Sequence, residues 1–310
     1  MKLNKPNFWD KKIGLLSLIL YPISLIVIFI VLLRKKLVTK IEFGIPVICV
    51  GNIYLGGTGK TPTSIFIANE LKKLGKKPVI IKKFYKSHYD EYNLIKEYFS
   101  DLIVRKNRSD AIKEAKSRNF DIVILDDGLQ EYKIRKNLNI VCFSQKQLIG
   151  NGLVLPSGPL RESLNAIKET HIVLINGNKD EEFENKIRGI NKSVKIYYAN
   201  YEPENINDFI NKKIFAIAGI GNPPNFFDLL IQKGLNVKKT KSFPDHFEIS
   251  KLEMSKIVLE AESEKCEILT TEKDFLRMKN LDTSKINYLK VKLNIPKKKE
   301  LLDGILKLYA

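Results

Sequence analysis

Residues 47–63 read VICVGNIYLGGTGKTPT and join three local patterns. The first four residues are apolar and largely β-branched, as in a buried strand, and a helical spacing of apolar residues begins at Ile65. The glycine-rich connection between them ends in Gly-Lys-Thr at positions 59–61. A strand, a glycine-rich loop and Gly-Lys-Thr at a helix start form a cradle for phosphate, because backbone N–H groups can surround the phosphate oxygens.

The phosphate prediction gives each residue type in the loop a task. The lysine reaches the β- and γ-phosphates, and the threonine hydroxyl ligates Mg²⁺. Tyr54 stands where the strict pattern G-x-x-x-x-G-K-[ST] has its first glycine, so an ordinary glycine-rich turn is the alternative. The predicted nucleotide-binding residues are Gly56, Gly57, Thr58, Gly59, Lys60, Thr61 and Pro62.

Net charge limits the kinds of partner. The chain has 53 Lys and Arg against 35 Asp and Glu, a formal net charge of +18. This excess indicates an anionic partner, such as nucleic acid or an acidic membrane, or else a lysine-rich composition with solvated side chains. The lysines are scattered without an arginine–aromatic platform, so no nucleic-acid partner is expected. The three cysteines lack C-x-x-C spacing and are expected to be buried thiols in a reducing compartment.

Residues 13–33, IGLLSLILYPISLIVIFIVLL, contain no charged side chain. A helix of this length crosses the ~30 Å hydrocarbon core of a bilayer. Basic residues flank both ends, so the positive-inside rule sets the orientation only weakly, and Pro22 also suits a helix lying in the interface. The alternative is a buried core helix. We expect residues 1–36 to be an N-terminal membrane anchor.

The rest of the 310-residue chain alternates strand-like and helical stretches. Strands are expected at 46–50, 78–81, 102–104, 121–125, 139–143, 171–175 and 194–200, and then at 214–218, 267–271 and 287–293. This alternation predicts an α/β fold with a largely parallel sheet covered by helices on both faces. A polar stretch near residues 201–213 separates two domains, expected at 37–205 and 206–310.

A second site-like segment, FDIVILDDGLQ, follows at residues 120–130. Its apolar run ends in Asp126 and Asp127. Carboxylates at a strand end, in a chain with a phosphate loop, fit the metal-binding acid of a P-loop nucleotide enzyme. The alternative is a turn of the Asp-Gly kind.

Three further stretches carry candidate polar residues. Asp90 and Glu91 form an acidic pair within a tyrosine-rich stretch, for which a solvated loop is the alternative. The turn-rich stretch LPSGPLRE holds Arg161 and Glu162 in place, and an arginine can bind phosphate through two hydrogen bonds. His246, in FPDHF, is the best acid–base candidate among the three histidines.

Taken together, these segments resemble the tetraacyldisaccharide 4′-kinase family of lipid A biosynthesis. The resemblance runs nearly the whole length, including the apolar N-terminal stretch. The motifs that carry it, in the family's order, are GNIYLGGTGKTP (51–62), DDGLQ (126–130), GNGLVLPSGPLRE (150–162), AGIGNPPNFF (218–227), FPDH (243–246) and TEKD (271–274).

The resemblance implies an activity and an architecture. The activity is transfer of the ATP γ-phosphoryl group to the 4′-hydroxyl of a tetraacylated glucosamine disaccharide 1-phosphate, giving lipid IVA, with Mg²⁺ as cofactor. The architecture is two Rossmann-like three-layer α/β/α domains, the first P-loop kinase-like, behind a hydrophobic membrane helix. The expected partners are an anionic glycolipid and the membrane, without an obligate protein partner. The expected location is the cytoplasmic face of a bacterial inner membrane.

The resemblance also implies roles for individual residues. Asp90 and Glu91 match by position the acidic pair of the family's G-D-E-P motif, with Asp90 as base. The implied catalytic residues are Asp90, His246, Lys60 and Asp126. The implied contacts to substrate or phosphate are Glu91, Arg108 and Arg161, and the implied metal ligands are Thr61, Asp127 and Glu162.

Departures from the family pattern concentrate near the acidic pair. Tyr89 and Tyr92 replace a glycine and a proline, and IKKFYK at 81–86 replaces S-R-G-Y-G. The arginine of that motif has no counterpart in this sequence other than Lys82 or Lys83.

Two other classes of protein share some of these features. A membrane-tethered P-loop NTPase switch, acting on a protein partner, would need no acceptor site. A non-enzymatic lipid- or nucleic-acid-binding protein would use the positive charge and would not bind Mg·ATP.

Overall fold

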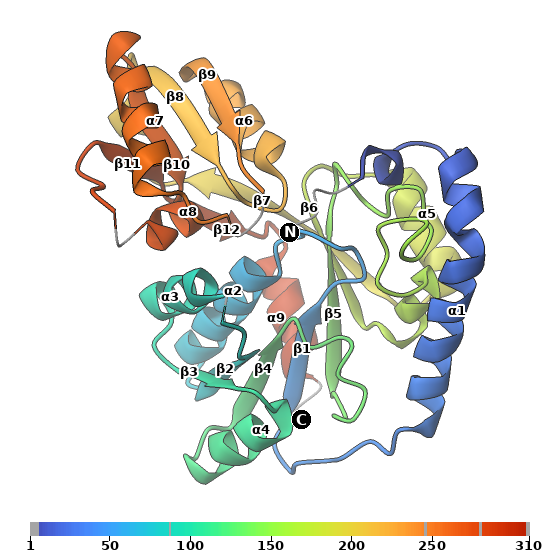
Figure 1. Cartoon of the computed structure of the whole chain (residues 1–310). Helices are drawn as coiled ribbons and strands as arrows, with labels where there is room; N and C mark the ends of the chain where they lie inside the picture. The colour runs from blue at the N-terminus through green and yellow to red at the C-terminus, as the bar shows by residue number, and fades with distance from the viewer. Residues whose placement is uncertain (1–5, 87, 245–246, 279–280, 308–310) are drawn as a thin grey trace. The chain divides into compact units, whose positions relative to one another are not determined.

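The structure is a computed structural model of the 310-residue chain and describes residues 6–86, 88–244, 247–278 and 281–307 (Figure 1). The chain forms two compact units. The large unit comprises Leu3–Phe84, Phe99–Asn200 and Leu293–Ala310, and the small unit comprises chiefly Tyr85–Tyr98 and Tyr201–Lys292. Each unit has its own sheet of mainly parallel strands, so the expectation of a mixed α/β fold with parallel sheets is confirmed.

The large unit is built on an eight-stranded sheet in the order β12-β7-β6-β5-β1-β4-β2-β3, of which the end of β7 and the start of β12 fall in the residue ranges of the small unit. The strands are β1 (Val47–Gly51), β2 (Pro78–Lys83), β3 (Leu102–Arg105), β4 (Ile122–Asp126), β5 (Leu138–Ser144), β6 (Ile172–Asn176), β7 (Lys195–Pro203) and β12 (Val291–Asn294). From β7 to β3 every neighbouring pair is parallel. The chain leaves β1 toward β2 and β3 and later builds β5 to β7 on the other side, so connections change direction at β1 (Figure 1). In open α/β sheets ligands bind at the carboxyl ends of strands at such a point.

Helices cover both faces of this sheet. Val47 and Cys49 of β1 share a core cluster with Ala111 and Ile112. The latter two belong to α4 (Arg108–Ser117), which covers that face together with α5 (Glu181–Ile190). Because successive strand side chains alternate between faces, the equally buried Ile48 and Val50 point the other way. The second face is covered by α2 (Lys60–Lys73), which contacts β1, β2 and β4 and connects β1 to β2.

The compact units are composed of different ranges from the expected domains. The last helix, α9 (Lys298–Leu306), packs in the large unit, where Lys298 pairs with Glu70 of α2 at 3.1 Å. Conversely, α3 (Tyr89–Tyr98) belongs to the small unit, because the Tyr98 hydroxyl donates to Glu272 at 2.7 Å. Neither pairing is visible locally, since both join segments far apart in the chain.

The small unit has a four-stranded parallel sheet in the order β11-β10-β8-β9. Its strands are β8 (Lys213–Ala218), β9 (Asn236–Ser242), β10 (Glu267–Thr271) and β11 (Ile286–Leu289). Ile214 packs with α6 (Pro223–Gln232) on one face, and Phe215 packs with α7 (Lys251–Ser263) on the other. This unit is therefore also layered as helix, sheet and helix.

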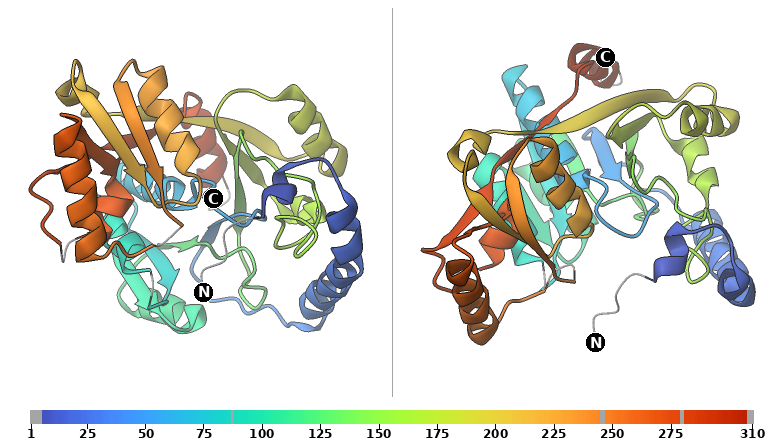
Figure 2. Two further views of the ribbon diagram at one scale, coloured as in Figure 1. Left: turned by 45° about the horizontal axis from the view of Figure 1, so that its top comes forward. Right: turned by 90° about the horizontal axis from the view of Figure 1, so that it is seen from above.

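The apolar N-terminal segment forms α1 (Leu15–Leu37). Its most apolar 18-residue window has a mean hydropathy of 2.9 and is only 11% buried, so by length and composition α1 is able to cross a membrane. One face of α1 lies beside the segment 150–162, as both views in Figure 2 show. The short helix η1 (Asn7–Asp10) precedes it, and there the Trp9 indole donates to the Pro156 carbonyl at 3.0 Å.

Candidate phosphate-binding site

The glycine-rich loop connects the carboxyl end of β1 to the first turn of α2. Gly56 has a φ of 143° and Gly59 a φ of 86°, conformations that residues with a side chain rarely adopt. Gly59 is the N-cap, so Lys60 is the first helical residue. The first N–H groups of a helix have no carbonyl partner within it, and together with the helix dipole they favour an anion. The loop therefore has the backbone that a phosphate site requires.

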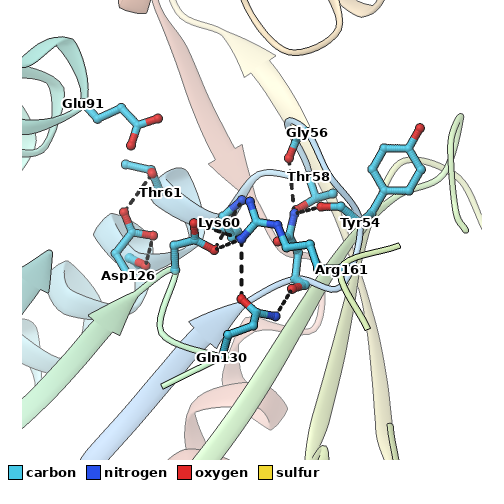
Figure 3. Close-up of polar contacts among 12 residues, drawn as sticks. Tyr54, Gly56, Thr58, Lys60, Thr61, Glu91, Asp126, Gln130 and Arg161 are labelled. Carbon is cyan, nitrogen blue, oxygen red and sulfur yellow. Dashed lines mark hydrogen bonds and ion pairs between the residues drawn. The ribbon is translucent and has the colours of Figure 1, made fainter. Parts of the chain in front are cut away.

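Two asparagines hold this loop in shape. The Asn52 side-chain amide donates to the carbonyls of Tyr54 at 2.7 Å and Gly56 at 3.2 Å, and to the Thr58 hydroxyl at 3.0 Å (Figure 3). Asn176, at the end of β6, donates to the Thr58 carbonyl at 2.6 Å. The sequence analysis missed both residues. Asn52 directly follows β1 and so carried a local signal, whereas Asn176 is brought in only by the sheet.

Tyr54 explains the departure from the strict phosphate-loop pattern. Its side chain is fully buried, and its hydroxyl donates to Asp10 at 2.9 Å. Burial, reinforced by the Asp10 carboxylate, raises the pKa of Tyr54 well above its usual value, so the phenol stays neutral. Tyr54 also forms a backbone bridge with Leu160. Tyr54 thus connects the loop to Asp10 and Leu160, at the position where the strict pattern has a glycine.

Asp126 forms the first polar cluster of the site. Its buried carboxylate at the end of β4 accepts hydrogen bonds from the hydroxyls of Thr61 at 2.9 Å and Ser64 at 3.3 Å (Figure 3). Lys82, buried at the end of β2, lies 2.5 Å from the same carboxylate. A hydroxyl and a carboxylate oxygen side by side are ligands that Mg²⁺ prefers, so the pair Thr61 and Asp126 fits this ion.

Asp127 faces a different set of cations. Its backbone has a φ of 57°, unusual for a residue with a side chain, and its carboxylate accepts from Arg161 at 3.0 Å. The Lys60 ammonium is 3.8 Å away. Burial favours the neutral acid, but Lys60 and Arg161 outweigh it and lower the pKa of Asp127 to about 2. Burial in turn lowers the pKa of Lys60, an effect that Asp127 opposes. The carboxylate beside Thr61 is therefore that of Asp126, while Asp127 holds the two cations of the loop region.

Arg108, expected to contact phosphate, directs its guanidinium hydrogen bonds to the turn that follows β4. It is buried at the start of α4, and its guanidinium donates to the carbonyls of Asp126 at 3.1 Å and Asp127 at 2.8 Å. It also pairs with Glu131 at 3.2 Å. The structure shows Arg108 fixing the backbone from which both carboxylates project.

Glu162, expected among the metal ligands, lies in a network of its own. Its carboxylate pairs with Lys35 of α1 at 2.6 Å and accepts from the Gln130 amide at 2.8 Å. The three predicted metal ligands therefore have different contacts: Thr61 bonds to Asp126, Asp127 lies beside Lys60 and Arg161, and Glu162 pairs with Lys35. Within the described ranges no group of three or more His, Cys, Asp or Glu side chains is arranged to hold a metal ion.

The acidic pair of the small unit lies on α3, so the alternative of a solvated loop is wrong. Asp90 is buried and accepts from Arg277 at 2.9 and 3.0 Å, with Lys273 at 3.8 Å. Glu91 pairs with Lys273 at 3.1 Å. A cavity of about 460 Å³ in this unit is lined by residues that include Asp90, Arg277 and Gly219.

The predicted site residues are therefore distributed over the two units. The large unit contains the glycine-rich loop, both strand-end aspartates, Arg108, Arg161 and Glu162. Asp90 and Glu91 belong to the small unit. His246 lies outside the residues that the structure describes.

Known proteins resemble this chain over its whole length. Residues 16–310 match the family model LpxK, tetraacyldisaccharide-1-P 4′-kinase. The chain is 40% identical to the tetraacyldisaccharide 4′-kinase of Pelagibacter ubique and 32% identical to that of Rickettsia bellii, in each case over 99% of both proteins. Its fold is similar to the crystal structure of LpxK from Aquifex aeolicus in complex with ATP, with a TM-score of 0.74 and 24% identity, covering 96% of this chain and all of the other.

Proposed function

Because the chain belongs to the tetraacyldisaccharide 4′-kinase family, we propose that it transfers the γ-phosphoryl group of ATP to the 4′-hydroxyl of a tetraacylated glucosamine disaccharide 1-phosphate. The product of this reaction is lipid IVA. The observation that carries the proposal is the glycine-rich loop at the start of α2, with Thr61 beside Asp126 and Lys60 beside Asp127. This arrangement suits phosphoryl transfer, which depends on positioning and on neutralising phosphate charge.

The large unit supplies the groups that act on the nucleotide. The loop N–H groups bind the phosphate oxygens, and the Lys60 ammonium neutralises the transferring group. Arg161, oriented by Asp127, adds a second cation at the same place. Thr61 and Asp126 would hold Mg²⁺, which when bound neutralises charge on the β- and γ-oxygens.

The small unit supplies the residue that we assign as the base. Asp90 accepts the proton of the 4′-hydroxyl, with His246 orienting or activating it. The bonds from Arg277 hold the Asp90 carboxylate in one position, so little reorientation is needed when the hydroxyl arrives. Glu91 remains a proposed substrate contact.

We also propose that residues 1–36 attach the enzyme to the bilayer through α1. Anchoring allows the acyl chains of the acceptor to stay in the membrane during the reaction. The net charge of +18 suits an anionic glycolipid and anionic lipid headgroups. We place the two units on the cytoplasmic face of a bacterial inner membrane, where ATP is available.

The test is direct phosphorylation of the acceptor. The full chain in detergent is incubated with a disaccharide 1-phosphate precursor, Mg²⁺ and ATP labelled at the γ-phosphate, and the labelled glycolipid is mapped. We expect label at the 4′ position and little ATP hydrolysis without acceptor. ATP hydrolysis with no labelled glycolipid would favour the membrane-tethered switch. Failure to bind Mg·ATP would favour a non-enzymatic lipid-binding protein.

A further inference from the structure

The membrane helix α1 has one polar face. Ser17 and Ser24 are fully buried, although most large apolar residues of the helix are exposed. Ser17, Ser24 and Lys35 are separated by intervals close to whole numbers of helical turns, so all three lie on one side of α1. A helix that only anchored the protein would need no such face.

The serine part of this face is bonded to the segment 150–162. The Ser24 hydroxyl donates to the Val154 carbonyl at 2.8 Å and accepts from the Ser157 N–H at 3.1 Å. The Asn151 amide donates to the Ser17 hydroxyl at 3.3 Å. Hydroxyl groups stabilise helix contacts in an apolar environment, and their small size allows close approach. The anchor is therefore fixed to the same segment that ends in Arg161 and Glu162.

At the other end of the polar face, Lys35 contacts Glu162. Their charged atoms are 2.6 Å apart, and Glu162 is only 2% exposed while Lys35 is 27% exposed. The Lys35 ammonium also lies 5.1 Å from the centre of the Tyr132 ring. Glu162 also accepts hydrogen bonds from Gln130 and, at 3.5 Å, from the Tyr132 hydroxyl. Because a buried carboxylate that loses its nearest cation is strongly disfavoured, Lys35 contributes to holding Glu162 in its position.

Glu162 is connected to the phosphate loop by further contacts. Its other carboxylate oxygen accepts from the side-chain amide N–H of Gln130 at 2.8 Å, and the side-chain oxygen of Gln130 accepts from Arg161 at 3.5 Å (Figure 3). Arg161 donates to Asp127 at 3.0 Å, and Asp127 lies 3.8 Å from Lys60. All these residues belong to the large unit, so the series is continuous from α1 to the loop lysine.

We propose that Lys35 is a positioning residue for phosphoryl transfer. Its charge holds Glu162, Glu162 orients Gln130, and Gln130 together with Asp127 orients the guanidinium of Arg161 beside the glycine-rich loop. Without Lys35 the Glu162 carboxylate turns toward water and Gln130 shifts with it, so Arg161 is oriented by Asp127 alone. The inference rests on the proposed function, since it assigns a residue to that reaction.

A lysine at the end of a membrane helix commonly has another role, which is to reach the lipid headgroups. Lys36 provides the matched control for that role. It is the next residue, carries the same charge at the same end of α1, and is exposed. A headgroup role predicts similar effects at both positions, whereas the proposal predicts an effect at Lys35 alone.

The experiment compares Lys35→Met, Lys35→Gln, Lys35→Arg and Lys36→Met in the full chain with the unchanged protein. It measures kcat, the KM for ATP, the membrane-bound fraction and the midpoint of thermal unfolding. We expect the Met and Gln variants at position 35 to lose kcat on the order of tenfold, because a loosely held catalytic group is less often in the reactive geometry. The KM for ATP and membrane binding should stay near normal. Lys35→Arg and Lys36→Met should keep nearly full kcat.

Several outcomes would overturn the inference. They are a normal kcat in a folded Lys35→Met or Lys35→Gln protein, equal losses at positions 35 and 36, or a Lys35→Arg protein as impaired as the Met variant. The Gln variant keeps a polar side chain at this site and serves if the Met variant does not fold. Absence of labelled glycolipid from the unchanged protein would count against the proposed function. Equal labelling by the unchanged and Lys35→Met proteins would count against this inference alone.

Discussion

Replacing Lys82 by Met should reveal how strongly the candidate phosphate site depends on a lysine inside it. Lys82 and Asp126 are both buried, and their charged atoms are 2.5 Å apart. In the variant the Asp126 carboxylate keeps two hydroxyl donors, Thr61 and Ser64, and loses its cation. The perturbation therefore leaves a buried carboxylate that is hydrogen-bonded but has lost its nearest cation.

The size of the effect follows from this arrangement. Removing one partner of a buried ion pair costs about 3–5 kcal/mol, and the two remaining hydroxyl donors place the expected loss at the lower end, about 3 kcal/mol. For a unit of this size that loss lowers the midpoint of thermal unfolding by roughly 6–12 °C. Mg²⁺ should restore part of the loss, because it binds the folded state at Thr61 and Asp126 in place of the missing ammonium.

The assay is thermal unfolding of Lys82→Met in EDTA and in excess Mg²⁺, beside the unchanged protein. Lys77→Met is the matched control, since Lys77 is exposed and directly precedes β2. We expect Mg²⁺ to raise the midpoint more in Lys82→Met than in the other two proteins. An unchanged midpoint in EDTA would show that Lys82 does not compensate Asp126. If the midpoint in EDTA is lowered but Mg²⁺ raises it no more than in the unchanged protein, the idea that Mg²⁺ takes the position of the Lys82 ammonium is refuted.

Three further measurements test other parts of the site. Lys60→Ala should fold yet lose roughly a hundredfold or more in turnover, because the variant lacks the ammonium group that we propose neutralises the transferring phosphate. Near-normal turnover would exclude this role. The pKa of Asp127 is lowered to about 2, so its contribution to stability is present above its unfolded pKa near 4 and is lost as pH falls from about 4 to 2. Asp127→Asn should flatten the dependence of the unfolding midpoint on pH in that range, and an unaltered acid limb would contradict the assignment. Burial raises the pKa of the Cys49 thiol and raises that of Cys142 to about 12, so a thiol reagent at neutral pH should label Cys266 first in the native protein, and rapid native labelling of either buried cysteine would refute their burial.

The central strands and the glycine-rich loop could be predicted because their signals are local. A β-branched run such as Ile122 to Asp126, bounded by turn residues, specifies its own conformation, and β4 lies within one residue of the expected range. β9 was missed because its sequence, NVKKTKS, is polar, as suits a partly exposed strand at the edge of the small sheet. α3 was missed because no apolar stripe stands out among its tyrosines and charges.

The site residues also divide into those with a local sequence signal and those without one. The loop, Asp126 and Asp127 lie in motifs whose chemistry is visible in a few consecutive residues. Lys82 carried a weaker signal as a departure from a familiar motif, and nothing local indicated that it meets an aspartate 44 positions away. The role of Lys35 was hidden because a lysine after an apolar helix already has an adequate explanation at the membrane surface. Partners that come together only through the fold are the ones that sequence reasoning overlooked.

Trp9 gives this protein an intrinsic fluorescent probe at one defined position. It is the only tryptophan in the chain, it is 7% exposed, and its indole is hydrogen-bonded to Pro156. Its carbonyl also accepts from the Asn151 N–H at 2.8 Å, so the ring reports on the segment that carries Arg161. Excitation at the long-wavelength edge of protein absorption therefore excites Trp9 selectively. The emission maximum and the fluorescence lifetime then report on the conformation of that segment without an added dye.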